Sequence, residues 1–409
     1  MNIRRTIPPT AAPISLIDLA HGFRGLMNRK FPASLENEMK EYFRTNHVFL
    51  VSSGKAALSL ILSSLKRLTG KKKVILPAYT CFSVPSSVRM AGLEIVLCDI
   101  RPETLDYDFN QLKKLLDDET LCILSTHLFG IPSDVAKIRS LVGDKRIFIV
   151  EDAAQAMGGA YDGQKLGTLG DVGFFSLGRG KNITCGSGGV IITSTRDIAD
   201  SIQKEHADLE KVPMIEYGKN IVEIIFQTIF IRPILYWFPR NLPFLKIGET
   251  HYYRSFPVKK FTRFQAGLLY NWRKKLEMMN RSRAGNAEYY IENFQLSGRM
   301  PIYDNELYYN RFPVYLADKA SKDKLCEMGN VLGISSMYPS PIHKIQEIKN
   351  NYKTVCFEYA EIISDTLVTL PTHVLLNEND RKRICEMVGK FICRDEREEP
   401  TMQQRAESQ

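Results

Sequence analysis

The stretch Phe174-Phe-Ser-Leu-Gly-Arg-Gly-Lys181-Asn-Ile-Thr places a lysine in a glycine-rich turn between two apolar runs, 171–177 and 188–194. The glycines allow the chain to turn tightly, so that Lys181 can project back over the edge of a sheet formed by these runs. A lysine in a loop is usually a solvated surface residue. Burial between two strands instead disfavours its charged form and frees the amine for nucleophilic chemistry. We therefore expect Lys181 to be chemically active.

An alternation of two patterns precedes this turn. From about residue 47 to residue 205, apolar runs rich in β-branched residues alternate with helical patterns that often end at glycine. Alternating strands and helices imply right-handed crossovers and a mostly parallel sheet with helices on both faces. The expected fold class is therefore α/β. The runs before the lysine turn are 47–52, 73–77, 94–100, 120–127 and 146–152.

The run that ends in Glu151-Asp152-Ala-Ala-Gln155 delivers two carboxylates at its carboxyl end. Ligands of open α/β sheets bind at the carboxyl ends of the strands, so Asp152 and Gln155 are expected to face a ligand. Taken alone, Asp152 is also explained as a cap at the start of a loop.

A second ligand-binding feature is the turn Ser52-Ser-Gly54-Lys55-Ala56, which follows the run 47–52 and opens a helix. The unpaired N–H groups and the positive dipole of a helix N-terminus suit a phosphate. Ser176, five residues before Lys181, is expected to donate to the same phosphate. The alternative is a plain strand-to-helix turn in which Ser53 is the cap.

These parts together are what pyridoxal phosphate (PLP) requires of a protein. The cofactor needs a lysine amine for its aldehyde, a carboxylate against its ring nitrogen, a phosphate cradle and a surface on the ring face. The carboxylate keeps the ring nitrogen protonated, which makes the ring an electron sink. We assign Lys181 to the aldehyde, Asp152 to the ring nitrogen and Gln155 to the neighbourhood of the phenolic oxygen.

The sequence resembles the DegT/DnrJ/EryC1/StrS family of PLP-dependent sugar aminotransferases over about residues 45–390. The resemblance is closest at residues 151–156 and at the stretch from Ser176 to Asn182 with the following Gly188-Gly189. It continues through 76–80, 127–134, Arg263-Phe-Gln265-Ala, Arg283 and 370–373. It implies the aspartate-aminotransferase fold (PLP fold type I), with a smaller C-terminal α+β domain.

The resemblance also implies roles. Lys181 and Asp152 are the catalytic pair, and Gln155 steadies the ring. Gly54, Lys55 and Ala56 hold the phosphate together with Ser176. A branch of the family that dehydrates sugars has histidine in place of the lysine, so Lys181 favours transamination.

Three positions depart from the family pattern. Threonine is usual where this chain has Lys55, whose ammonium pairs with the phosphate or points to solvent. An aromatic residue that stacks on the ring is common where this chain has Cys81, and we assign the stacking to Phe82, with Tyr79 as the alternative. The asparagine that usually reaches the phosphate from the partner subunit is not evident in residues 248–256.

Composition limits the other options. The eight cysteines are scattered without zinc-ligand spacing, so we expect no metal site and no disulfide framework. The net charge of +9 suits an anionic substrate, whereas no nucleic-acid-binding motif is present. Residues 1–10 are followed by no uninterrupted apolar run, so we expect no signal peptide and a cytoplasmic protein.

Residues 221–245 are apolar but are interrupted by charged residues and prolines. We interpret them as a docked insert or a subunit contact, with peripheral attachment to the inner face of a membrane as the alternative. The expected organisation is an N-terminal arm (1–30), a large PLP-binding domain (31–205), an apolar insert and loop (206–260), a small domain with a long linking helix (261–393) and a disordered tail (394–409).

The resulting hypothesis is a homodimeric aminotransferase. It moves an amino group from L-glutamate to a keto group of a nucleotide-linked sugar, for a surface polysaccharide or glycoconjugate. One alternative is a non-enzymatic regulator or assembly protein on the same fold. Another is transamination of a cyclitol or a different keto acceptor.

Overall fold

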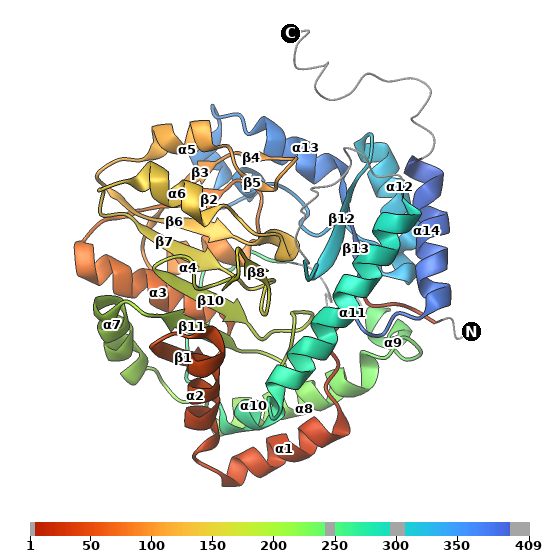
Figure 1. Ribbon diagram of the computed structural model, residues 1–409, viewed down its shortest axis with the longest axis horizontal. Coiled ribbons are helices and arrows are strands. Elements are labelled where there is room, and N and C mark those ends of the chain that lie inside the picture. The colour runs from red at the N-terminus through yellow and green to blue at the C-terminus, as the bar shows by residue number, and fades with distance from the viewer. Residues whose placement is uncertain (1–4, 242–249, 295–306, 393–409) are drawn as a thin grey trace.

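The computed structural model describes residues 5–241, 250–294 and 307–392, and a seven-stranded sheet lies at its centre (Figure 1). The strand order is β1-β11-β10-β7-β6-β2-β3. Neighbours from β10 to β3 are parallel, while β11 is antiparallel to both β1 and β10. The predicted α/β class and the mostly parallel sheet are confirmed. The strands are β1 (His47–Val51), β2 (Lys73–Pro77), β3 (Glu94–Cys98), β6 (Thr120–Thr126), β7 (Phe148–Asp152), β10 (Val172–Ser176) and β11 (Gly189–Thr193).

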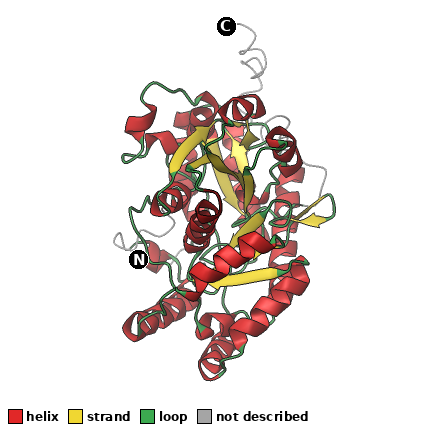
Figure 2. Cartoon of the chain, turned by 90° about the vertical axis from the view of Figure 1, so that its left-hand side faces the viewer, coloured by secondary structure: helices red, strands yellow, loops and turns green. Residues whose placement is uncertain are grey.

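Helices cover both faces of this sheet (Figure 2). Successive residues of a strand point to opposite faces. In β11, for example, Ile191 packs into the core beneath α3, while Val190 and Ile192 pack into a second core with α2. This is why the strands are apolar throughout rather than alternating. The helices of this part are α2 (Phe31–Phe43), α3 (Gly54–Thr69), α4 (Ser83–Met90), α5 (Phe109–Leu115), α6 (Val135–Val142) and α7 (Arg196–Ala207).

The small domain is built on an antiparallel pair of strands, β12 (Arg311–Tyr315) and β13 (Leu367–Pro371). Helices α12 (Lys319–Gly329), α13 (Glu358–Thr366) and α14 (Glu378–Ile392) pack around this pair. The minor elements are β4 (Ile100–Arg101), β5 (Asp106–Tyr107), β8 (Ala160–Tyr161), β9 (Gln164–Lys165), η1 (Leu128–Gly130), η3 (Asn330–Leu332), η4 (Ile342–Lys344) and η5 (Lys349–Tyr352).

The long linking helix expected in the small domain is two helices, α10 (Arg263–Leu268) and α11 (Trp272–Asn293). The break occurs at Asn271, which adopts a left-handed conformation with φ 55°. Asparagine tolerates this conformation better than most residues. The turn buries Trp272 completely in the core.

The N-terminal arm is irregular only at residues 5–14, because α1 (Leu16–Met27) follows it. Ser15 and Asp18 form a capping box that starts this helix directly after the prolines, and the sequence-based expectation of an arm to residue 30 overlooked it.

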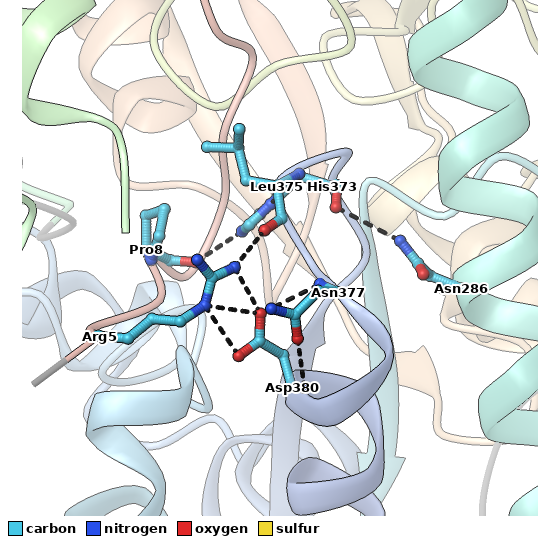
Figure 3. A network of polar contacts seen from close by, with 7 residues as sticks. All are labelled: Arg5, Pro8, Asn286, His373, Leu375, Asn377 and Asp380. Atoms are coloured by element: carbon cyan, nitrogen blue, oxygen red, sulfur yellow. Dashed lines mark hydrogen bonds and ion pairs between the residues drawn. The ribbon is translucent and has the colours of Figure 1, made fainter. Parts of the chain in front are cut away.

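The irregular part of the arm is tied to the small domain (Figure 3). Arg5 donates to both carboxylate oxygens of the buried Asp380, and His373 Nε2 donates to the carbonyl of Pro8 at 2.8 Å. Burial lowers the pKa of His373 to about 4, so its neutral ring accepts from Leu375 N–H at its other nitrogen. The arm is therefore an integral part of the fold.

The apolar insert forms α8 (Met214–Phe230) and α9 (Trp237–Arg240). Ile224 of α8 is buried in the core under β11, and Ile221 and Ile225 pack beside it. The opposite face exposes Ile215 (90%) and Val222 (66%). The insert thus docks on the large domain along one face only. None of the helices within the described ranges is both long enough and apolar enough to span a membrane.

Two parts of the expected organisation are not fully covered by the described residues. Residues 242–249 of the insert and the tail at 394–409 fall outside the described residues.

Candidate active site

A cavity of about 140 Å³ opens at the carboxyl ends of the parallel strands. This is the edge at which open α/β sheets bind ligands. All the predicted site residues except Ala56 and Phe82 line it. Those in the cavity wall are Gly54, Lys55, Asp152, Gln155, Ser176 and Lys181.

Asp152 ends β7 and is buried at the floor of the cavity. Its Oδ1 accepts the Ala154 N–H at 3.1 Å. Burial raises the pKa of this carboxyl, while the nearby ammonium of Lys181 opposes the rise. The structure therefore brings the two predicted catalytic residues to one cavity.

The turn that carries Lys181 is closed by Gly180, which has φ +72°. A side chain there would be strained, and its Cβ would lie 2.2 Å from Cγ2 of Thr10 in the N-terminal arm. The Thr10 hydroxyl donates to the Gly180 carbonyl at 2.7 Å. The arm thus fixes the backbone immediately before the lysine.

Helix α11 holds the same turn from the other side. Arg283, fully buried, donates to the carbonyls of Lys181 at 2.9 Å, Asn182 at 3.3 Å and Ala11 at 3.4 Å. Asn280 accepts from the Asn182 amide at 3.1 Å. No carboxylate of the described ranges pairs with Arg283. Its guanidinium instead donates to backbone carbonyls and so orients the lysine turn. The sequence pointed to Arg283 only through the family resemblance, without this role.

The start of α3, which we predict to bind the phosphate, lines the cavity with Gly54 and Lys55. Ser53 caps the helix, because its hydroxyl accepts the Ala56 N–H at 3.1 Å. The Ala56 N–H is therefore already bonded, and Ala56 is absent from the cavity lining. The N–H groups of Gly54 and Lys55 belong to the first turn, where no helical carbonyl reaches them. The prediction that this turn binds phosphate thus depends on Gly54 and Lys55. Ser53 caps the helix, as the alternative interpretation of the turn predicted.

Gly54 allows this end to close on Ser176. A Cβ at position 54 would lie 2.8 Å from the Ser176 Cβ and 3.0 Å from its Oγ. Only glycine leaves Ser176 in place beside the helix N-terminus, so the two predicted phosphate contacts are adjacent.

We expect Gly54→Ala to weaken PLP binding about tenfold, because the new methyl group displaces a donor to a charged phosphate. Gly54 has no positive φ, so the substitution tests space alone. Fluorescence titration with PLP and with pyridoxal, which lacks the phosphate, measures the effect. Pyridoxal binding should change little. Gly218→Ala, on an exposed part of α8 with no atom within 4 Å, is the control. Equal losses for PLP and pyridoxal would contradict the assignment.

The side chain of Lys55 is half-buried and meets no carboxylate of the described residues. Its ammonium lies over the ring of Tyr253, 3.8 Å from the centroid, with Phe256 at 5.0 Å. Burial lowers the pKa of Lys55. The segment that follows the insert therefore packs against Lys55, which lines the cavity of the same chain beside the predicted phosphate contacts.

The ring face is less well matched to the prediction. Phe82 is buried at the start of α4 and is absent from the cavity lining, whereas Cys81 lines it. The Cys81 sulfur lies 3.0 Å from the Ser83 hydroxyl and 3.4 Å from the Thr250 hydroxyl. The alternative stacking residue, Tyr79, is also absent from this lining.

His127 is a cavity residue to which sequence reasoning gave no role. Its Nδ1 accepts the Ser133 N–H at 3.1 Å, so the proton resides on Nε2, which donates to Glu151 at 2.8 Å. Glu151 also accepts the Gly167 N–H at 2.8 Å and the Gly170 N–H at 2.5 Å. Of the two adjacent carboxylates, Glu151 is thus occupied by hydrogen bonds within the fold, whereas Asp152 lines the cavity.

The donor set of the cavity fits PLP. It offers a lysine amine, a buried carboxylate, a helix N-terminus with a serine hydroxyl and a glutamine amide. Two further buried hydroxyls in its lining, those of Thr80 and Thr126, lack hydrogen-bond partners among the described residues. Buried polar groups are normally satisfied, so these point to a polar ligand.

An α/β sheet with a half-buried lysine and a buried carboxylate at one edge defines a PLP-binding protein of the aminotransferase class. The chain belongs to the DegT/DnrJ/EryC1/StrS aminotransferase family, whose model matches residues 24–217 and 250–389. The predicted family and fold are thereby confirmed, and PLP as the cofactor is confirmed for the family and its structural neighbours.

Individual proteins extend this comparison. The chain is 31% identical over 171 residues to GDP-perosamine synthase of Vibrio cholerae, covering 42% of this chain and 46% of that protein. It is 33% identical over 168 residues to L-glutamine:2-deoxy-scyllo-inosose aminotransferase of Streptomyces kanamyceticus, covering 41% and 39% respectively. These matches span less than half the length of either relative.

A solved structure shows the shared fold. The GDP-4-keto-6-deoxy-D-mannose-3-dehydratase of Escherichia coli with bound hydrated PLP superposes with a TM-score of 0.74 at 19% identity. The alignment covers 93% of this chain and 98% of the other.

Proposed function

We propose that this protein is a PLP-dependent aminotransferase that moves an amino group from L-glutamate to a keto group of a nucleotide-linked sugar. The observation that carries the proposal is the presence of Lys181 and Asp152 in one cavity, with Ser176 and the N-terminus of α3 beside them. The product is an amino sugar for a surface polysaccharide or glycoconjugate.

The residues have separate tasks in this proposal. When bound, PLP supplies an aldehyde that takes up an amine and a protonated ring that draws electrons from the carbon losing its proton. Lys181 holds the aldehyde and then moves a proton with its freed amine. Asp152 keeps the ring nitrogen charged, while Gly54, Lys55 and Ser176 anchor the phosphate.

Lysine at position 181 supports transamination over dehydration. Its amine can both bond the cofactor aldehyde and act as the base, and transamination needs both functions. The relative named as a perosamine synthase supports a nucleotide-linked sugar as the acceptor. The active form is expected to be a homodimer, in which the second chain covers apolar faces such as that of α8.

One relative favours a second function. The name of the Streptomyces kanamyceticus aminotransferase specifies a cyclitol acceptor and glutamine as the donor. Transamination of a cyclitol is therefore the main rival of the sugar reaction, and glutamine the main rival of glutamate.

A donor and acceptor screen tests the proposal. Purified protein with PLP is given glutamate or glutamine, together with each of several nucleotide-linked keto-sugars or a keto-cyclitol. We expect the keto acid of glutamate and an amino sugar, identified by mass spectrometry. Lys181→Ala protein is the control for uncatalysed exchange. Amination of the cyclitol alone would overturn the choice of acceptor, and protein that binds no PLP would favour the non-enzymatic alternative.

A further inference from the structure

Tyr338 of the small domain reaches into the cavity, although nothing in the sequence singled it out. It lies in the loop between η3 and η4 and is almost completely buried. Its hydroxyl oxygen lies 2.9 Å from Nε2 of Gln155, which donates to it. Tyr338 lines the cavity together with Asp152 and Lys181.

Gln155 is held at its other end by the turn η1. The Phe129 N–H donates to Oε1 of Gln155 at 3.1 Å. Phe129 has φ 59°, an unfavourable conformation for a residue with a side chain, and this conformation aims its N–H at the amide. An amide oxygen accepts and an amide nitrogen donates, so both partners specify the same orientation of Gln155. Nε2 carries a second N–H that Tyr338 does not use.

The position of Tyr338 is itself fixed by the large domain and by its own loop. The Tyr79 ring packs edge-on against its ring at 5.4 Å. The Ile342 N–H donates to the Ala78 carbonyl at 2.8 Å, and the buried Arg311 donates to the Ser335 hydroxyl at 2.7 Å. These contacts therefore fix the position of the Tyr338 hydroxyl.

Tyr338 keeps its proton. Burial raises the pKa of this phenol well above its ordinary value, and the negative charges of Cys81 and Asp152 would add to the rise. A neutral phenol oxygen accepts from Gln155 without bringing a second negative charge beside Asp152.

We propose that Tyr338 is a positioning residue of the active site, which acts by fixing the Gln155 amide with its second N–H toward an oxyanion in the cavity. This inference rests on the proposed function, because the oxyanion is the phenolic oxygen of PLP. Tyr338 comes from the small domain, so the cofactor receives this donor only when the small domain is seated on the sheet edge.

Tyr338→Phe tests the proposal because it removes the acceptor and keeps the ring. We expect the dissociation constant for PLP to rise about threefold to tenfold, the loss of one oriented donor. We also expect the absorption maximum of bound PLP to shift, since a donor to the ring oxygen is displaced. Tyr315→Phe is the matched control: this buried hydroxyl of the small domain donates to the Pro102 carbonyl at 2.9 Å, and Tyr315 is not in the cavity wall.

A double-mutant cycle with Gln155→Leu separates positioning from general destabilisation. If Tyr338 acts through Gln155, adding Tyr338→Phe to Gln155→Leu causes no further loss of PLP affinity. Additive losses would overturn the proposal, as would identical spectra and affinities for Tyr338→Phe and Tyr315→Phe. Thermal unfolding of the PLP-free variants checks that both tyrosine variants fold. Wild-type protein without PLP affinity would overturn the proposed function as well, whereas wild-type binding with no effect of Tyr338→Phe defeats this inference alone.

Discussion

Lys181→Ala should lower the turnover number by about a thousandfold or more, since the variant loses both the amine that bonds the cofactor aldehyde and the proton carrier. The visible absorbance of bound PLP should disappear at the same time, because it depends on the bond to the lysine. Absorbance spectra and single-turnover assays of PLP-loaded protein measure both effects.

Lys181→Arg is the control for folding and charge. Arginine keeps a cation in the turn that Arg283 and Thr10 hold by backbone carbonyls alone, so those contacts do not depend on the side chain at 181. We expect both variants to unfold at a temperature close to that of the wild type and both to be inactive. Turnover that survives in either variant would refute the assignment of Lys181.

Asp152→Asn should lower the turnover number by roughly a hundredfold to ten-thousandfold, in line with the loss of a single preorganised charge at a reacting centre. Asparagine keeps an oxygen for the Ala154 N–H but cannot hold the ring nitrogen in its protonated form. Because no buried charge has to be desolvated in the variant, its stability should be retained or raised.

Reconstitution with N-methyl PLP sharpens this second test. The methylated ring nitrogen is positively charged without a proton, so it should restore part of the activity of Asp152→Ala. Glu151→Gln provides the contrast. The carboxylate of Glu151 accepts from His127, Gly167 and Gly170, so an amide nitrogen in its place faces a donor. The variant should therefore be less stable, and N-methyl PLP should not restore its activity. No rescue of Asp152→Ala would argue against the pairing with the ring nitrogen.

Much of the fold could be predicted because its signals are local. Each of the seven sheet strands lies within one of the predicted apolar runs, and the observed ends differ from the predicted ends by at most two residues. Glycine closes α3 and the lysine turn as expected, since Gly70 and Gly180 both have positive φ. The parallel sheet then follows from the alternation of strands with helices.

The features that were missed depend on contacts between distant residues. Tyr338 meets Gln155 across 183 positions, and no periodicity indicates such a contact. The direction of Lys55 depends on Tyr253, which lies beyond the insert. The left-handed turn at Asn271 is chosen by the burial of Trp272, a tertiary effect that overrides the helical pattern.

The bond between Arg5 and Asp380 spans 375 positions, which has a consequence for the order of events during synthesis. At about 5–20 residues per second, a ribosome needs roughly 20–75 s to pass from one partner to the other. Thr10 can meet Gly180 after 170 residues, whereas Pro8 must wait for His373 and Arg5 for Asp380. The contacts of the arm therefore become possible at widely different times, with the partner of Thr10 made first and the partner of Arg5 last. The nascent chain can shape the lysine turn early, but it secures the small domain only after Asp380 has been made.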